Sequence, residues 1–422
     1  MKRPGPTARV LLGLVLGALI GLTLAYWFPE QAPRAAAFAR PIGSLWLAGL
    51  QMTVAPLVFS LVVLGVATAS DAAASGRVAR RALITFVVLL TGFALYAAAL
   101  APVLLSFFPH SASLAETLRG ATSAVVDVPV PSLGDWIAGA IPTNAIMAAA
   151  QNAMLPLVVF SLFLGFALTR LAPERRDPLL AICRGLADAM IVIVHWMLLA
   201  APLGVFALIL VVCTSAGIGV IGALVGYIGL LVALYLGATA ICYPIVWLVA
   251  RESPLRFAKG ILPAQVVAAS TQSSLATLPS MIESAGERLG YRRNVVALVL
   301  PMAVTLFRIT SPVQYIGAAC FIAWAIGVEL SALQLGAAAA LSVVISLGSV
   351  GLPGQVSFMA TVMPVSQSLG LPVEPLGLLL AVDTIPDVFA TTGNVTGDLT
   401  ATAIVNQRSS DIPDVSPEDI PA

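Results

Sequence analysis

The sequence predicts an all-α, polytopic membrane protein with eight transmembrane helices and two re-entrant helical hairpins. Of the 422 residues, 59% are apolar and only 10% are charged, whereas ordinary soluble domains carry about 25% charged residues. Apolar runs long enough to cross a bilayer, about 17 to 25 residues or more, recur along the chain. Two further apolar segments are interrupted by proline, glycine and serine.

Eight apolar runs predict the transmembrane helices. We place them at 8–27, 43–69, 82–108, 153–172, 186–213, 218–250, 294–326 and 373–405. Basic residues precede the first run as in a signal peptide, but the run is too long for the apolar part of one, so we interpret it as a span. Several runs exceed the thickness of a bilayer, which predicts tilted or broken helices.

The interrupted segments, 256–282 and 331–370, predict the two hairpins. The first contains Ser270-Thr-Gln-Ser-Ser-Leu-Ala-Thr-Leu-Pro279, and the second contains Leu347-Gly-Ser-Val-Gly-Leu-Pro353-Gly354. Backbone polar groups left free at such breaks are tolerated only inside protein or along a cavity. A pair of interrupted segments is typical of the binding site of a transporter.

Basic residues predict the orientation in the membrane. They cluster at Lys2, Arg3, Arg9, at Arg77, Arg80, Arg81, at Arg170, Arg175, Arg176, at Arg251, Arg256, Lys259, and at Arg288, Arg292, Arg293. Alternating spans place all five clusters on one side, which predicts cytoplasmic termini in an inner (plasma) membrane protein. The region 109–150 is then outside, and the acidic, proline-containing tail is expected to be disordered.

Composition argues against several function classes. Four scattered cysteines and two histidines make neither a disulfide framework nor a zinc site. His195 fits a hydrogen-bonded packing residue better than a proton carrier. A phosphate-binding loop for ATP and a basic aromatic patch for nucleic acid are both missing from the sequence. An intramembrane enzyme with Asp383 and Asp387 as an acid pair, and an anion channel, remain as alternatives to a carrier.

A polar stripe near the C-terminus gives the best evidence for function. At about 100° per residue, its five members fall within roughly 80° of helical arc; they are Asp383, Asp387, Thr391, Asn394 and Asp398. Acids at hydrocarbon depth are costly and usually face a cavity, a partner or a substrate path. The alternative is that Asp398 lies in water at the helix end and that the others are caps.

These motifs resemble those of the dicarboxylate/amino acid:cation symporters, the glutamate transporter family. Ser270 to Pro279 resembles the serine-rich tip of their first hairpin, and Asp387 to Asp398 resembles their last-helix substrate and cation motif. Ile141-Pro-Thr-Asn144 and Ala201-Pro-Leu-Gly-Val-Phe-Ala207 also match family landmarks. The chain is identified as a divergent, bacterial-type member, and the resemblance covers nearly all of it.

The resemblance implies an inverted-repeat fold, a homotrimer and an elevator mechanism. Residues 1–81 and 109–217 would form the static scaffold, with helices 1 and 2 in the former and helices 4 and 5 after the extracellular connection in the latter. Residues 82–108 and 218–405 would form the mobile transport domain, followed by a disordered acidic tail at 406–422.

The resemblance also implies the residues of a substrate site. The first hairpin would contribute Ser273 and Ser274, and the second, acting as a gate, Val350, Gly351, Pro353 and Gly354. Asp387 would take the substrate α-amino group, Thr391 and Asn394 would be polar contacts, and Asp398 would be a sodium ligand. Ala390 stands where carriers of acidic amino acids have an arginine, which favours neutral or small polar substrates.

A second departure concerns cation coupling. Phe307 and Ile309 replace an asparagine and an aspartate of the family's sodium motif, so oxygen ligands are lost. Arg308, at the position between them, has three interpretations: a tethered cation in place of sodium, a ligand for an acidic substrate, or a structural ion pair with Asp383 or Asp398. The candidate charge-compensating set is therefore Arg308, Asp383, Asn394 and Asp398, with a residual sodium site at Asn394 and Asp398.

From these observations we expect a secondary active transporter of amino acids, with Na⁺ or H⁺ as the coupling ion and sodium coupling weakened or lost. No other cofactor and no catalytic residue are expected. The alternatives are a dicarboxylate or acidic amino acid symporter with Arg308 binding the substrate carboxylate, and an uncoupled anion channel or facilitator.

Overall fold

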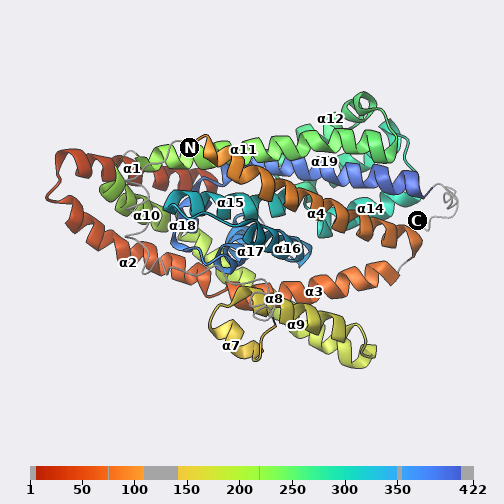
Figure 1. The fold of residues 1–422 in the computed structure, drawn as a ribbon, viewed down its shortest axis with the longest axis horizontal. Coiled ribbons are helices and arrows are strands. Elements are labelled where there is room, and N and C mark those ends of the chain that lie inside the picture. The colour runs from red at the N-terminus through yellow and green to blue at the C-terminus, as the bar shows by residue number, and fades with distance from the viewer. Residues whose placement is uncertain (1–5, 75, 109–140, 218, 349–353, 410–422) are drawn as a thin grey trace.

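The protein is built from helices packed side by side along one long axis (Figure 1). The computed structural model describes residues 6–74, 76–108, 141–217, 219–348 and 354–409, and every regular element within these ranges is helical. Six helices there are long and apolar enough to cross a membrane, or up to seven if a bent pair is one span. This arrangement confirms an all-helical, multi-span protein, while the full set of eight spans and two hairpins stays a prediction.

One set of helices packs around the N-terminal segments. It comprises α1 (Pro6–Trp27), α2 (Ala32–Gln51), α3 (Val54–Ala74), α8 (Met154–Leu168), α9 (Pro173–Leu199) and α10 (Ala201–Ala216). Helix α10 packs against α1 and α2, and α3 packs against α8 and α9. The short helix α7 (Ala145–Ala150) precedes α8, and the Asn144 side chain caps it by accepting hydrogen bonds from the backbone N–H groups of Ile146 and Met147, both at 3.0 Å.

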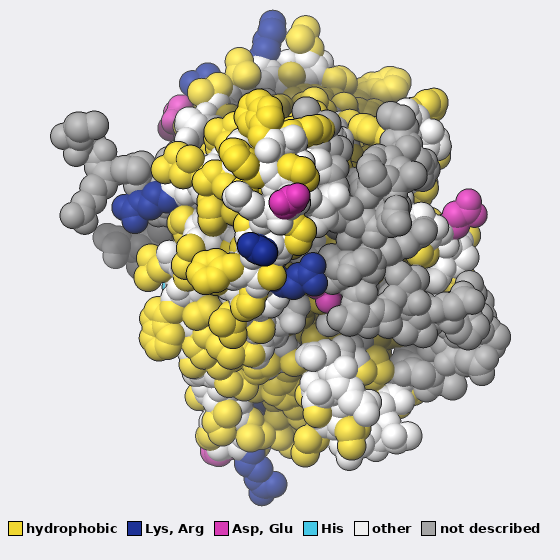
Figure 2. All heavy atoms as spheres, turned by 90° about the vertical axis from the view of Figure 1, so that its left-hand side faces the viewer, with side chains coloured by type: hydrophobic (Ala, Val, Ile, Leu, Met, Phe, Trp, Pro, Cys, Tyr) yellow, Lys and Arg dark blue, Asp and Glu magenta, His cyan; other side chains and the backbone are white. Residues whose placement is uncertain are grey.

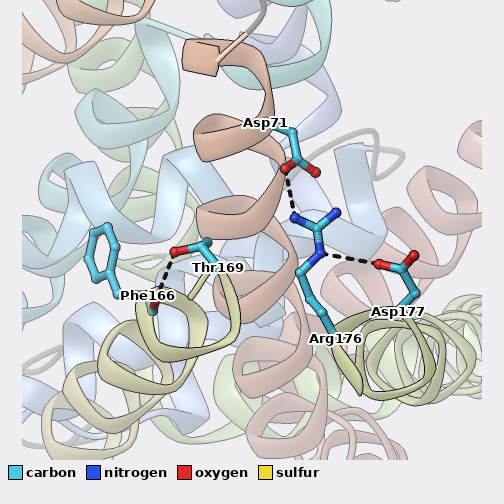
Figure 3. A network of polar contacts seen from close by, with 5 residues as sticks. All are labelled: Asp71, Phe166, Thr169, Arg176 and Asp177. Carbon is cyan, nitrogen blue, oxygen red and sulfur yellow. Dashed lines mark hydrogen bonds and ion pairs between the residues drawn. The ribbon is translucent and has the colours of Figure 1, made fainter. Parts of the chain in front are cut away.

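A polar contact ties α3 to the start of α9 (Figure 3). Arg176 donates from Nη1 to Oδ1 of Asp71 on α3 and from Nε to Oδ1 of Asp177, both at 3.1 Å. The carboxylates are more than half exposed, so this network positions the two helices but contributes little to stability.

The second set of helices contains the C-terminal half of the chain and α4. It comprises α4 (Arg77–Ser106), α11 (Gly219–Ile245), the π-helix η1 (Val246–Ala250), α12 (Pro254–Thr271), α13 (Ser274–Glu283), the π-helix η2 (Ser284–Arg288), α14 (Arg293–Leu306), α15 (Thr310–Ile326), α16 (Ala332–Gly348), α17 (Gly354–Ser368), α18 (Glu374–Val382) and α19 (Thr384–Arg408). Helix α19 is its centre and contacts α4, α11, α12 and α14.

Many large apolar side chains are exposed on the described surface, as lipid contact requires. Seen from the end that carries the connection between α1 and α2, hydrophobic side chains cover much of the described face and charged side chains are few (Figure 2). Large exposed side chains such as Phe38, Ile146 and Val88 are apolar. In water such a surface would promote aggregation, whereas in a bilayer these side chains contact apolar lipid tails.

Some span boundaries predicted from the sequence are wrong. A single span over 186–213 does not exist, because α9 ends at Leu199 and α10 begins at Ala201. Pro202 favours a new helix start, since proline fits the first turn and disfavours helix in the residue before it. The apolar stretch predicted at 43–69 begins earlier, at Ala32, and continues across the junction of α2 and α3.

Three interruptions in the second set shape the site described below. Between α12 and α13, Gln272 adopts a left-handed conformation (φ 52°). Between α14 and α15, residues 307–309 leave the helix, and Phe307 is extended. Between α18 and α19 the axis bends by 73° at Asp383. The segment 254–283 is a helix–break–helix unit. In the other predicted hairpin, α16 and α17 are described but residues 349–353 between them are not. Re-entry of both segments into the membrane remains a prediction.

Candidate substrate and cation site

The polar stripe predicted from the sequence lies on α19, with Asp383 at the bend before it. Asn394 is 6% exposed and Asp398 is 0% exposed, while Asp387 is half-buried. The interpretation that Asp398 lies in water is therefore wrong. The interpretation that all five residues share one helix is also wrong for Asp383, because α19 begins after it.

The break between α14 and α15 is held against this stripe by Thr310. The backbone N–H of Thr310 donates to Asn394 Oδ1 at 3.0 Å, and its hydroxyl lies 2.9 Å from the same oxygen and 3.2 Å from the carbonyl of Ala390. A backbone N–H can only donate, so this contact fixes the orientation of the Asn394 amide. The Asn394 side chain thus holds the non-helical residues before α15 against α19 by these hydrogen bonds.

Replacing Thr310 by valine tests how much the hydrogen bonds of its hydroxyl stabilise the protein. Because Thr310 is 2% exposed, losing its hydroxyl should lower the free energy of unfolding by about 1 kcal/mol or more. Thermal unfolding in detergent measures the loss. Thr305→Val is the matched control, since the Thr305 hydroxyl is exposed and contacts only carbonyls of its own helix. Equal shifts in both variants would contradict the role given to Thr310.

Two apolar side chains fill the space beside the break. The ring of Phe307 is 0% exposed and stacks on Phe86 of α4 with ring centres 4.7 Å apart. Ile309 is also 0% exposed and packs on α19 at Gly397, where a Cβ atom would come within 2.9 Å of the isoleucine side chain. The absence of a side chain at Gly397 is therefore required for this close approach.

Arg308 lies in the break, half-buried, between these two apolar neighbours. Its Nε is buried and has no hydrogen-bond partner, and no carboxylate in the described part of the chain lies within ion-pair distance. Its charge acts through space on Asp387 and Asp398. The direct structural ion pair considered from the sequence is therefore not formed, although the charges are near each other.

The described residues do not fit a sodium ion well. A hard cation needs several oxygen ligands, but Phe307 and Ile309 offer no side-chain oxygen and Asn394 Oδ1 already accepts from Thr310. Both carboxylate oxygens of Asp398 lack a hydrogen-bond partner in the part of the chain that the structure describes. An isolated buried carboxylate is unfavourable, and the nearby positive charge is that of Arg308.

Asp383 belongs to a second polar region on the other side of the bend. Gln314 of α15 donates to its Oδ1 at 2.7 Å. Three tyrosine hydroxyls are buried without a hydrogen-bond partner among the described residues, those of Tyr227 and Tyr235 on α11 and of Tyr315 on α15. Buried polar groups of this kind mark polar sites inside a core, so Asp383 lies in a polar site that Gln314 of α15 helps to form.

The tip between α12 and α13 contributes serines with different environments. Ser273 caps α13 by accepting from the backbone N–H of Ala276 at 3.2 Å. The Ser274 hydroxyl is buried and has no hydrogen-bond partner among the described residues. From the other predicted hairpin, Val350, Gly351 and Pro353 lie outside the described residues, and Gly354 begins α17.

Sequence reasoning missed several polar residues that organise the site. Gln265 of α12 donates to Thr396 of α19 at 2.9 Å and to Tyr243 of α11 at 3.2 Å, linking three helices. Gln314 donates a hydrogen bond to Asp383, and Thr310 donates to Asn394. A glutamine within an apolar run was the available signal, because a buried amide requires partners.

The comparisons with known proteins decide the family. A family model described as the sodium:dicarboxylate symporter family matches residues 7–408. The chain belongs to the sodium:dicarboxylate symporter family. It is thus a membrane transporter of a symporter family, and the resemblance read from its motifs is confirmed.

The names of similar proteins in this family mention different substrates. The chain is 30% identical over 412 residues to the proton/glutamate-aspartate symporter of Escherichia coli, covering 94% of this chain and 91% of that protein. It is 30% identical over 455 residues to neutral amino acid transporter A of Homo sapiens, covering 95% and 81%. It is 28% identical over 405 residues to a C4-dicarboxylate transport protein of Rhodospirillum rubrum, covering 94% and 87%.

Proposed function

We propose that this symporter-family member moves neutral or small polar amino acids across the membrane without a requirement for sodium. The observation that supports the substrate class is the presence of an acid at Asp387 together with an uncharged residue at Ala390. Asp387 is half-buried and has no hydrogen-bond partner in the described ranges, so its carboxylate is available to an ammonium group. Ala390, about one turn further along α19, offers no guanidinium to a second substrate carboxylate.

Other parts of the proposed site complete the recognition of an amino acid. The buried, unpartnered hydroxyl of Ser274 at the start of α13 lies where helix N–H groups favour a carboxylate. Thr391, buried on α19, adds a polar contact beside Asp387. Val350, Gly351, Pro353 and Gly354 are proposed to close the site as a gate. Ammonium and α-carboxylate are the two groups that every amino acid presents.

The proposed coupling follows from the charges around the break. Asp398 is fully buried, and Arg308 provides a fixed positive charge nearby. We propose that Arg308 takes the place of a bound cation, which leaves exchange, facilitated transport or coupling to protons through Asp383, Asp387 or Asp398. The two helix sets are proposed to act as scaffold and moving transport domain of a homotrimer, with cytoplasmic termini.

Sodium replacement tests the proposed coupling. In proteoliposomes, uptake of a labelled neutral amino acid should proceed at the same rate when external Na⁺ is replaced by choline, because a tethered guanidinium does not dissociate. Counterflow of the same amino acid, measured in parallel, verifies that the carrier is active. Strict sodium dependence of uptake alongside active counterflow would contradict the role of Arg308, while absence of both would contradict the transport proposal.

A second candidate is a carrier of dicarboxylates or acidic amino acids. Arg308 favours it, because its partly exposed guanidinium is a suitable ligand for a second carboxylate. Relatives with glutamate, aspartate or C4-dicarboxylate in their names are consistent with it. In that case Arg308 would recognise substrate and would not compensate for a missing cation.

A further inference from the structure

An apolar groove runs along the outer side of the second helix set, between α4, α11 and α19. Leu89, Phe93 and Tyr96 of α4 and Ile245 of α11 line its walls, and Arg408 of α19 lies at one end. Its volume is about 380 Å³. Helices α4, α11 and α19 run side by side in Figure 1, and each contacts the other two. The groove is separate from the polar stripe, whose acids it does not contain.

Two local features of the helices create the groove. Gly92 of α4 lies in its floor, and a Cβ atom there would meet no atom within 4 Å. On the opposite wall, α11 passes into the π-helix η1, which widens the turn that carries Val249. Single π-turns inside helices occur frequently at functional sites. The hollow therefore results from a missing side chain on one helix and a widened turn on the next.

The dimensions of the groove match one leaflet of a bilayer. Its α4 wall extends from Thr85 to Tyr96, which is about 16 Å at 1.5 Å per residue. The hydrocarbon core is about 30 Å thick, so this wall spans roughly half of it. Exposed apolar side chains flank the groove, including Val88 and Leu248. The groove thus opens toward lipid and has the length of one acyl chain.

Positive charge gathers at the end of the groove near Thr85. Arg408, in the last turn of α19, lines this end. Arg81, one turn before Thr85 on α4, donates from Nη1 to the backbone carbonyl of Arg408. Arg80 is exposed beside it. Guanidinium groups next to an apolar groove complement an anionic lipid headgroup, because phosphate oxygens accept charge-assisted hydrogen bonds from arginine.

We propose that this groove binds one acyl chain of an anionic phospholipid, with the headgroup phosphate at Arg408. The bound chain fills the space beside Gly92 and η1 and thereby stabilises the packing of α4 and α11 on α19. This site takes a lipid as a structural ligand, and it does not depend on which substrate the protein transports.

The test compares lipids on the purified, delipidated full-length protein. Phosphatidylglycerol should raise the melting temperature more than phosphatidylcholine with the same acyl chains, because lipid bound to the native state alone stabilises it. Native mass spectrometry should detect one retained phosphatidylglycerol per chain. Equal effects of the two lipids would overturn the role of Arg408, and an equal shift with inorganic phosphate alone would overturn the lipid site.

Two variants locate the site. Gly92→Leu fills the groove and should abolish the phosphatidylglycerol-dependent shift in melting temperature. Gly229→Leu on α11 is the matched control, because that glycine is also exposed with open space around its Cβ position, and the shift should be retained. Arg408→Gln should reduce the effect of phosphatidylglycerol to that of phosphatidylcholine. An unchanged shift in Gly92→Leu, or its loss in Gly229→Leu, would overturn the proposal.

Discussion

Replacing Asp387 by asparagine is expected to reduce amino acid transport about 100-fold. The ammonium group of the substrate leaves water on binding and needs an ionised partner, and Asn keeps the shape of the side chain but not its charge. Truncating one partner of such a charge pair costs about 3 kcal/mol, which corresponds to roughly a 100-fold loss in kcat/KM. Counterflow of a labelled neutral amino acid in proteoliposomes measures this loss.

Glu374→Gln is the matched control for this variant. Glu374 is an exposed acid in the first turn of α18, in the same bent pair of helices, and its neutralisation should leave transport intact. Both variants should unfold at the temperature of the unaltered protein, since Asp387 has no hydrogen-bond partner to lose within the described ranges. Full transport by Asp387→Asn would refute the assignment of Asp387 to the amino group.

The second large effect is expected on stability, when Arg308 and Asp398 are substituted singly and together. Arg308→Met leaves the fully buried Asp398 carboxylate without its nearby positive charge, and an uncompensated buried charge is unfavourable, so the variant should unfold at a lower temperature. Asp398→Asn alone should also destabilise. In Arg308→Met with Asp398→Asn both charges are gone, so the loss of stability should be smaller than the sum of the single losses. Thermal unfolding in detergent measures all four proteins.

Transport by the same variants separates the interpretations of Arg308. If Arg308 stands in for a cation, Arg308→Met should impair neutral and acidic substrates alike, and adding Asp398→Asn should restore transport together with stability. Selective loss of acidic substrates would instead favour Arg308 as a substrate ligand. Restored stability without restored transport would leave Arg308 with a structural role only, contrary to the proposal.

Much of the fold was predictable because lipid imposes simple rules on sequence. Apolar length located the helices, and the Pro and Ser interruptions of the first predicted hairpin located the break at Gln272. The boundary at Ala200 was missed, because the flanking sequence is apolar on both sides and only Pro202 marks it. The bend at Asp383 was also missed, although Pro386 follows it closely in the sequence and a proline removes a hydrogen bond to the preceding turn. The sequence allows a break there, but packing against other helices decides the angle.

The candidate site was predictable in its residue types but not in its pairings. The stripe on α19 follows from helical periodicity, so Asp387 and Asn394 could be assigned to one face. That Asn394 Oδ1 is occupied by Thr310, and that Asp383 is tied to Gln314, depends on which helices meet in space. Arg308 was conspicuous as a base in an apolar run. Its distance from every described carboxylate depends on the unwound backbone between α14 and α15, which the sequence does not specify.

The packing of Ile309 on Gly397 has a consequence for engineering this protein. Under the proposed function, an aspartate at position 309 alone should not create a sodium site, because its carboxylate would lie against the backbone of α19 at Gly397, where Ile309 now packs. Phe307 would have to change too, which would remove its stacking on Phe86. The proposed independence from sodium therefore rests on several tightly packed neighbours at once, and an ion ligand introduced here would require coordinated changes in α4, in the break before α15 and in α19.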